Sequence, residues 1–211
     1  KEDRIATFSM NHYDTGILYF ACWYIGAVVV PINISEESDR VKYILDNSNT
    51  KIVFTRDEHK DNLPESDAYK IVSFDEFNWD AETGELDIPP YENKETEAMI
   101  VYTSGTTGNP KGVVLTQYNL MADAYSIAGW HKLYKGDTMM CVLPIHHVNG
   151  TVVTIMTTMF YGGRLVLNRK FHTEKFFPRL SEENVKVVSV VPTLLQFLLH
   201  SEEDASKHDL G

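Results

Sequence analysis

The sequence has few cysteines and a shortage of basic residues, and each scarcity excludes a class of protein. Its 211 residues include two cysteines, Cys22 and Cys141, far apart in apolar surroundings. This spacing fits neither a disulfide framework nor a metal site, so we expect two buried, reduced thiols in a cytoplasmic protein. Lysine and arginine number 19 against 30 acidic residues, and the net charge of -11 argues against nucleic acid or an anionic membrane as the main partner.

Uninterrupted apolar segments of membrane-spanning length are also lacking. Residues 15–35 contain no charged side chain and approach the length of a membrane span. Gly26, Pro31 and Asn33 interrupt this stretch, so we predict a helix over 13–25 and a buried strand over 27–32 in place of a transmembrane segment. A charged start, an apolar stretch and a cleavage site do not occur in the order that a signal peptide requires.

Short apolar strands that alternate with helices are, by contrast, abundant. Strands are predicted over 51–55, 70–73, 98–103, 112–115, 138–143, 164–167 and 185–191. Helices are predicted from Ser35 or Ser38 to 47, from an N-cap at Thr116 to 127, over 150–160 and 173–180, and from Pro192 onward. This alternation indicates an α/β fold of mainly parallel sheets flanked by helices, in which ligands bind beyond the carboxyl ends of the strands.

The segment 79–97 separates two parts of this pattern. It is polar and contains Gly84, Pro89 and Pro90, which is typical of a surface connection. We therefore expect a first α/β portion over 1–78, a crossing segment over 79–97 and a second portion over 98–211.

Residues 102–112, Tyr-Thr-Ser-Gly-Thr-Thr-Gly-Asn-Pro-Lys-Gly, form the most informative segment. Glycines let backbone N–H groups approach a ligand, hydroxyls donate hydrogen bonds, and Lys111 adds a positive charge, so the segment suits a polyphosphate. It is not a P-loop, because no serine or threonine follows Lys111, and Pro110 and Gly112 oppose immediate helix formation. We predict a phosphate-binding loop that joins two strands, with a solvated hairpin turn as the alternative.

A second polar segment, Pro-Ile-His-His-Val-Asn-Gly over 144–150, follows another predicted strand. The imidazole of His147 is suited to hydrogen-bonding a carboxylate at neutral pH. The alternatives are two half-exposed histidines at a strand end, or a metal site, for which no third ligand of suitable spacing is evident. Gly150 would leave room for a carbon chain beside the following apolar helix, unless that helix only packs in the core.

These segments resemble the signature motifs of the AMP-forming adenylating enzymes, and of the acyl-CoA synthetases (fatty-acid–CoA ligases) in particular. Residues 102–112 resemble the phosphate-binding loop of that family and residues 144–150 its Pro-x-x-His motif, and residues 15–33 and 187–199 fit the same family. The resemblance implies a part of the large N-terminal domain, with the C-terminal domain absent. No Tyr-Gly-x-Thr-Glu segment of the family occurs before Gly211, so we expect that these residues alone do not turn over.

The resemblance implies ATP-dependent activation of a carboxylic acid, in particular a fatty acid, to an acyl-adenylate and then a CoA thioester, with Mg²⁺ entering with ATP. It implies a catalytic role beside the substrate carboxylate for His147, and substrate-site positions for Asn149 and Gly150. His146 stands where relatives usually have an aromatic residue. The resemblance assigns the grip on the β- and γ-phosphates to Thr103, Ser104, Gly105, Thr106, Thr107, Gly108 and Lys111.

Other functions share the same loop. Amino-acid-activating relatives generally carry an aspartate in the second motif, whereas residues 144–150 contain no acid, so a plain carboxylic acid fits better. An aryl-acid ligase, a luciferase-like oxygenase and a non-catalytic nucleotide-binding protein remain alternatives.

Overall fold

A computed structural model describes residues 2–78, 95–103 and 108–210 of the chain. The chain divides into two compact units, Lys1–Asn119 and Leu120–Gly211. The sequence placed the division at 79–97, of which residues 79–94 lie outside the described residues. The strands that follow this segment, β5 (Glu97–Thr103) and β6 (Lys111–Thr116), join the sheet of the first unit, because β5 pairs with β2 (Val28–Ile32).

The described strands of the first unit form a six-stranded sheet in the order β4-β3-β1-β2-β5-β6. Its remaining strands are β1 (Arg4–Phe8), β3 (Thr50–Thr55) and β4 (Lys70–Ser73). Neighbouring strands are parallel except β5 and β6, which pair antiparallel. The predicted α/β class is therefore confirmed, and the sequence located β3, β4 and β5 to within one residue.

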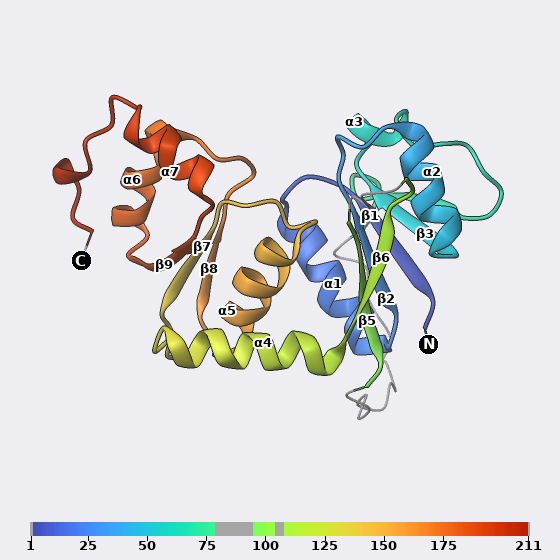
Figure 1. Cartoon of the computed structure of the whole chain (residues 1–211), viewed down its shortest axis with the longest axis horizontal. Helices are drawn as coiled ribbons and strands as arrows, with labels where there is room; N and C mark the ends of the chain where they lie inside the picture. The colour runs from blue at the N-terminus through green and yellow to red at the C-terminus, as the bar shows by residue number, and fades with distance from the viewer. Residues whose placement is uncertain (1, 79–94, 104–107, 211) are drawn as a thin grey trace. The chain divides into compact units, whose positions relative to one another are not determined.

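Helices pack on both faces of this sheet (Figure 1). Helix α1 (Tyr13–Ile25) is tied to the strands by Trp23, whose indole N–H donates to the Ala98 carbonyl at 2.9 Å, and by Tyr19, whose hydroxyl lies 3.1 Å from that of Thr7. Helix α2 (Ser38–Asn47) packs on one face of the sheet, against every second residue of β1 and β2. Its core members are Val41, Ile44 and Leu45, packed with Ala6, Phe8, Val28, Val30 and Val53.

The second unit contains a parallel three-stranded sheet in the order β8-β7-β9. Its strands are β7 (Thr138–Cys141), β8 (Arg164–Leu167) and β9 (Val185–Ser189). The helical segments are α4 (Gln117–Trp130), which begins just before the division between the units, η1 (Asn149–Met156), α5 (Thr157–Phe160), α6 (Thr173–Glu182), α7 (Pro192–Leu199) and η2 (Ala205–Lys207).

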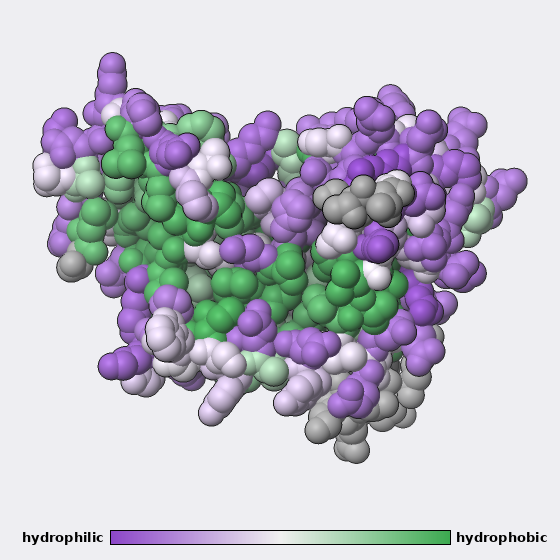
Figure 2. All heavy atoms as spheres, in the orientation of Figure 1, coloured by the Kyte–Doolittle hydropathy of each residue, from purple (hydrophilic) through white to green (hydrophobic). Residues whose placement is uncertain are grey.

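Consecutive residues of β7 enter two different cores, as the two-residue period of a strand requires. Met140 packs with Phe176 of α6 and Leu198 of α7, whereas Met139 packs with Ala128 and Leu133 at the end of α4. Figure 2 shows hydrophobic side chains gathered over the strands and α5 of this unit on the face in view. Both faces of the small sheet are therefore buried.

Local signals in the sequence explain where several helices begin. Thr116 caps α4 as predicted, because its hydroxyl accepts from the Asn119 N–H at 3.2 Å while the Asn119 side chain accepts from the Thr116 N–H at 2.9 Å. Pro192 occupies the start of α7, also as predicted. The cap of α2 is Glu37, without a side-chain hydrogen bond, so the predicted caps Ser35 and Ser38 are wrong.

The predicted state of the two cysteines is confirmed, since Cys22 and Cys141 are both buried and free. Burial raises the pKa of each thiol to about 12. Helix α1 ends at Ile25, where Gly26 adopts the left-handed conformation with φ 73°. Among the described residues, no helix is long and apolar enough to cross a membrane.

The reciprocal cap of α4 gives a direct test of this helix start. We expect Thr116→Ala to lower the free energy of unfolding by about 0.5–2 kcal/mol, because the Asn119 N–H loses its acceptor. Thr116→Ser keeps the hydroxyl and is expected to stay close to the parent value. Urea unfolding followed by circular dichroism measures both variants, and equal stabilities of the alanine and serine forms would contradict the assignment.

Candidate active site

The predicted phosphate-binding loop connects β5 to β6 as a hairpin. Thr103, the last residue of β5, lies opposite Lys111, the first residue of β6, and its hydroxyl is 3.4 Å from the Lys111 carbonyl. Both side chains are exposed, and Lys111 makes no ion pair within the described residues. The predicted strand–loop–strand arrangement is confirmed for Thr103, Gly108 and Lys111. Ser104, Gly105, Thr106 and Thr107 lie outside the described residues.

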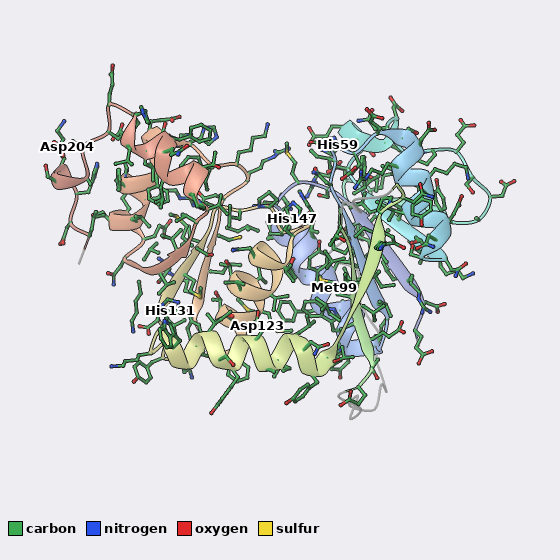
Figure 3. The ribbon with its side chains drawn as sticks, in the orientation of Figure 1. His59, Met99, Asp123, His131, His147 and Asp204 are labelled. Atoms are coloured by element: carbon green, nitrogen blue, oxygen red, sulfur yellow. The ribbon has the colours of Figure 1, made fainter. Side chains whose placement is uncertain are left out.

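Two features fix the base of this hairpin. Met99 of β5 is fully buried, pairs with Val29 of β2 and is labelled in Figure 3. Gly108 has φ 131°, which glycine adopts without strain and other residues rarely reach. Because β5 runs parallel to β2, the loop leaves the carboxyl edge of the parallel strands, where ligands of α/β sheets bind.

The second motif lies in the second unit, beyond the carboxyl end of β7. The chain turns at Ile145 and His146 and then enters η1, a π-helix, before continuing into α5. The sequence predicted one helix over 150–160 and gave no sign that its first part is a π-helix. The wider turns of a π-helix are rare and frequently mark functional sites.

His147 is exposed at the entrance to η1 (Figure 3). Its backbone N–H donates to the Pro144 carbonyl at 3.2 Å, and its own carbonyl accepts from the Thr151 N–H at 3.0 Å. The Thr151 hydroxyl donates to the Ile145 carbonyl. These bonds hold the backbone of the motif while the imidazole of His147 stays accessible to a ligand.

Gly150 is buried against the turn that precedes it. A Cβ atom at this position would lie 2.4 Å from the Pro144 carbonyl oxygen and 2.9 Å from the Cα of Ile145, closer than real Cβ atoms approach. The space beside Gly150 is therefore filled by the protein backbone. The expectation that this glycine leaves room for a carbon chain is wrong, because the missing side chain serves the packing of η1 on the turn.

His146 and Asn149 carry buried polar atoms without a partner. The His146 Nε2 and the Asn149 Oδ1 form no hydrogen bond in the described part of the chain. Burial, aided by the neighbouring His147 ring at 4.3 Å, lowers the pKa of His146 to about 4, so this imidazole is neutral at pH 7. An unsatisfied buried polar atom is costly, and its retention is typical of a site that receives a ligand or water.

An ion-pair network that the sequence did not predict lies at the carboxyl edge of the first sheet. Arg56, which follows β3, donates to Asp14 at the start of α1 and to Asp75, which follows β4. His12 Nδ1 lies 3.0 Å from the Asp14 carboxylate. Asp14 is 3% exposed, and its Oδ1 has no hydrogen-bond partner in the structure described. The signal was the presence of charged residues shortly after two neighbouring strands, Arg56 after β3 and Asp75 after β4.

A family model described as "AMP-binding enzyme" matches residues 1–211. The chain belongs to the AMP-binding enzyme family.

Curated relatives in this family are acid–CoA ligases. The chain is 31% identical to the sulfoacetate–CoA ligase of Cupriavidus necator over 210 residues, which cover 93% of this chain and 40% of the relative. It is 31% identical to the 2-succinylbenzoate–CoA ligase of Listeria monocytogenes, over 94% of this chain and 41% of that protein. Human mitochondrial malonate–CoA ligase ACSF3 is 27% identical, over 94% and 36% respectively. The chain thus spans about two fifths of these relatives.

Solved structures agree with this membership. The inhibitor-bound N-terminal domain of FACL13 from Mycobacterium tuberculosis matches with a TM-score of 0.89 and 27% identity, over 100% of this chain and 55% of that one. O-succinylbenzoate-CoA synthetase (MenE) of Bacillus subtilis in complex with AMP matches with a TM-score of 0.85 and 25% identity, over 98% and 53%. The AMP-binding enzyme chain therefore has the fold of the N-terminal domain of these proteins.

The close approach at Gly150 gives a matched pair of substitutions within the second unit. Gly150→Ala is expected to lower the free energy of unfolding by about 1–3 kcal/mol or more, because the new methyl group displaces the Pro144–Ile145 backbone. A Cβ atom added at Gly129 in α4 would meet nothing within 4 Å. Gly129→Ala is therefore expected to raise the free energy of unfolding by about 0.4–1 kcal/mol. Urea unfolding compares the two, and a harmless Gly150→Ala would refute the packing assignment.

The buried neutral His146 predicts a dependence of stability on pH. Its pKa is lower in the folded chain than in the unfolded chain, so the unfolded state binds more protons between about pH 6.5 and pH 4. Stability contributed by this group is present above pH 6.5 and is lost as the pH falls toward 4, by about 1–3 kcal/mol.

We expect His146→Phe to flatten the fall in unfolding free energy between pH 6.5 and pH 4.5, because it removes both the titrating ring and the unpartnered nitrogen. His131→Gln, at the exposed histidine labelled in Figure 3, serves as the control and is expected to retain the fall. Urea titrations at four pH values provide the measurement. An identical pH profile in His146→Phe and the parent protein would show that His146 is not the group responsible.

Proposed function

We propose that the protein is an AMP-forming acid–CoA ligase that activates a carboxylic acid, and a fatty acid in particular. The observation that carries this proposal is the exposed Thr103–Lys111 hairpin at the carboxyl edge of the first sheet, in a chain that belongs to the AMP-binding enzyme family. In the proposed reaction the acid's carboxylate attacks the α-phosphorus of ATP and pyrophosphate leaves. The thiolate of CoA then attacks the acyl carbon, and AMP leaves.

The hairpin supplies what the first of these steps requires. A triphosphate needs its charge held by hydrogen-bond donors and cations that are already in place before the reaction. The Lys111 ammonium is exposed and without an ion pair among the described residues, and the Thr103 hydroxyl lies directly across the hairpin. We assign the β- and γ-phosphates to Thr103, Gly108 and Lys111, and, by resemblance to the family, to Ser104, Gly105, Thr106 and Thr107.

We propose that the imidazole of His147 binds the acid's carboxylate through a hydrogen bond. This ring is exposed, its backbone is fixed by two hydrogen bonds, and the neighbouring neutral His146 adds no positive charge at pH 7. Asn149 contributes a buried amide oxygen that lacks a donor and is suited to accept one from the substrate or from water. Gly150 acts in the site by letting η1 pack against the turn.

Magnesium enters this proposal with the nucleotide. Among the described residues, no group of three or more His, Cys, Asp or Glu side chains lies together where a metal could bind. Mg²⁺ binds preferentially to phosphate oxygens and water, supplemented by few protein ligands, and it would neutralise phosphate charge. The phosphates held by the hairpin, together with water, would therefore provide most of its ligands.

Two classes of acid have separate support. The fatty acid is supported by the likeness to a fatty acyl CoA synthetase of Mycobacterium tuberculosis, a 25% identical structure whose match covers 99% of this chain. A short acid with a second charged group is supported by the names of the sulfoacetate and malonate ligases. The corrected role of Gly150 removes one argument for a long chain. We keep the fatty acid as the first candidate and the short polar acid as the second.

Two further proposals concern the complete reaction and its location in the cell. The chain spans 40% of the length of the sulfoacetate ligase, so we propose that segments beyond these residues are needed for turnover. The cytoplasm remains our proposed compartment, although human ACSF3 is a mitochondrial protein.

Exchange of radiolabelled pyrophosphate into ATP by the intact protein tests the proposal. Lys111→Ala is expected to slow exchange by about 10- to 100-fold, which corresponds to about 1.5–3 kcal/mol for a charged hydrogen bond. Lys51→Ala, at an exposed lysine of β3, is the matched control and is expected to exchange normally. Exchange that continues at the parent rate in Lys111→Ala would remove this residue from the site, and exchange with neither fatty nor short polar acids would reject the ligase.

A further inference from the structure

A second cationic site lies in the second unit, in a cavity of about 180 Å³ beside the segment that follows β8. Its cationic lining residues are Arg169, Lys170, Lys175 and Arg179, and no carboxylate residue lines it. Met140 and Phe176 line it as well, and both belong to the hydrophobic core of the unit. The cavity therefore joins four positive charges to an apolar wall, in a chain whose net charge is -11.

This cavity is separate from the second motif. Met140 and Val142 face the core formed with α6 and α7, and both line the cavity. Cys141 points to the opposite face, where its Sγ lies 3.9 Å from the Gly150 carbonyl at the start of η1. The cavity and η1 consequently occupy opposite faces of the same small sheet. The residues of the cavity have no role in the proposed phosphate loop or at His147.

Hydrogen bonds hold one of the cations in place. The Arg179 guanidinium donates to the Asn168 Oδ1 at 2.7 Å, and the Asn168 Nδ2 donates to the Cys141 carbonyl at 3.3 Å. Asn168 is 8% exposed, so this chain of bonds is shielded from water. A guanidinium held by a buried amide loses little further side-chain entropy when it binds an anion.

The ammonium groups of Lys170 and Lys175 make no contribution to the fold through hydrogen bonds or ion pairs among the described residues. Neither the Lys170 nor the Lys175 ammonium has a hydrogen bond or an ion pair within the described residues, and both side chains are exposed. Glu174 pairs with His172 at 3.5 Å and lies within the electrostatic range of Lys175, and Glu183 pairs with Arg164 at 2.8 Å and with Arg179 of the cavity at 3.8 Å. Lys170 and Lys175 line one cavity without an ion-pair partner among the described residues, so their charges repel one another, and a bound anion would relieve this repulsion.

We propose that this cavity binds the phosphate group of a small phosphorylated molecule. The two lysine ammonium groups, beside the guanidinium held by Asn168, match a tetrahedral dianion better than a carboxylate, whose single charge would leave one of these lysines unpaired. The cavity volume of about 180 Å³ is enough for a phosphate with a few more atoms. The apolar wall accommodates the short organic part.

Isothermal titration calorimetry of the full chain with inorganic phosphate, glycerol phosphate and malonate tests this proposal. The double substitution Lys170→Gln/Lys175→Gln is expected to weaken phosphate binding at least about tenfold, because two charge-assisted contacts are removed. Neither lysine side chain bonds to the fold, so circular dichroism should be unchanged. Lys51→Gln on β3 controls for non-specific attraction and is expected to bind as the parent does.

The three ligands distinguish the source of the phosphate. Tighter binding of glycerol phosphate than of inorganic phosphate supports a phosphate ester as the occupant, and equal binding supports free phosphate in the same site. Malonate that binds as tightly as either would overturn the preference for phosphate. Binding that survives the double substitution in a Lys111→Ala background, where the proposed phosphate loop cannot contribute, or that falls equally in Lys51→Gln, would overturn the site. Neither result depends on ligase activity.

Discussion

Parallel strand pairing is the constraint on which the rest of both units depends. Strands that run the same way end at the same edge of a sheet, so the segments that leave this edge are brought together. In the first unit the hairpin loop after β5 and the Arg56 network after β3 leave that edge. In the second unit the histidine motif follows β7 and the cationic segment follows β8. The apolar strands thereby determine where the polar chemistry is placed.

Polar atoms left without partners occur at these same edges. The Asp14 Oδ1 lies beyond the first sheet, and the His146 Nε2 and Asn149 Oδ1 lie beyond β7. Each buried polar atom of this kind costs about 1–3 kcal/mol of stability, which core positions rarely tolerate. The compact cores formed by α1 and α2 in one unit and by α6 and α7 in the other offset this cost. A site that must bind polar ligands therefore depends on packing that lies behind it.

The sequence predicted those parts of the fold that depend on short-range signals. The apolar runs located the strands, and Thr116 and Pro192 located two helix starts, because caps and strand periodicity are properties of neighbouring residues. The pairing of β5 with β2 could not be predicted, because it joins residues that are distant in sequence. The π-helix and the close packing at Gly150 were missed because no residue pattern in the sequence marks them. Only the folded backbone shows that Pro144 fills the space beside that glycine.

Candidate site residues followed a similar rule. Thr103, Gly108 and Lys111 could be predicted as candidates because one continuous segment contains them. The Arg56 network was not, because it is assembled from separated segments. The cations of the cavity lie close together over 169–179, but in the sequence they look like ordinary surface residues. Lys170 and Lys175 can be identified as candidate ligands only in the folded chain, where Arg179 of α6 lines the same cavity and is held by Asn168.

The overall negative charge does not oppose anion binding at these places. At physiological ionic strength the Debye length is about 8 Å, so distant acidic residues on the surface contribute little to the potential within a pocket. Lys111 lacks a carboxylate partner in the described residues, and the cavity beside β8 has cations but no acid in its lining. The local charges therefore decide the affinity there. An acidic surface around them would repel anions that approach elsewhere, which leaves binding concentrated at the few positions where cations are grouped.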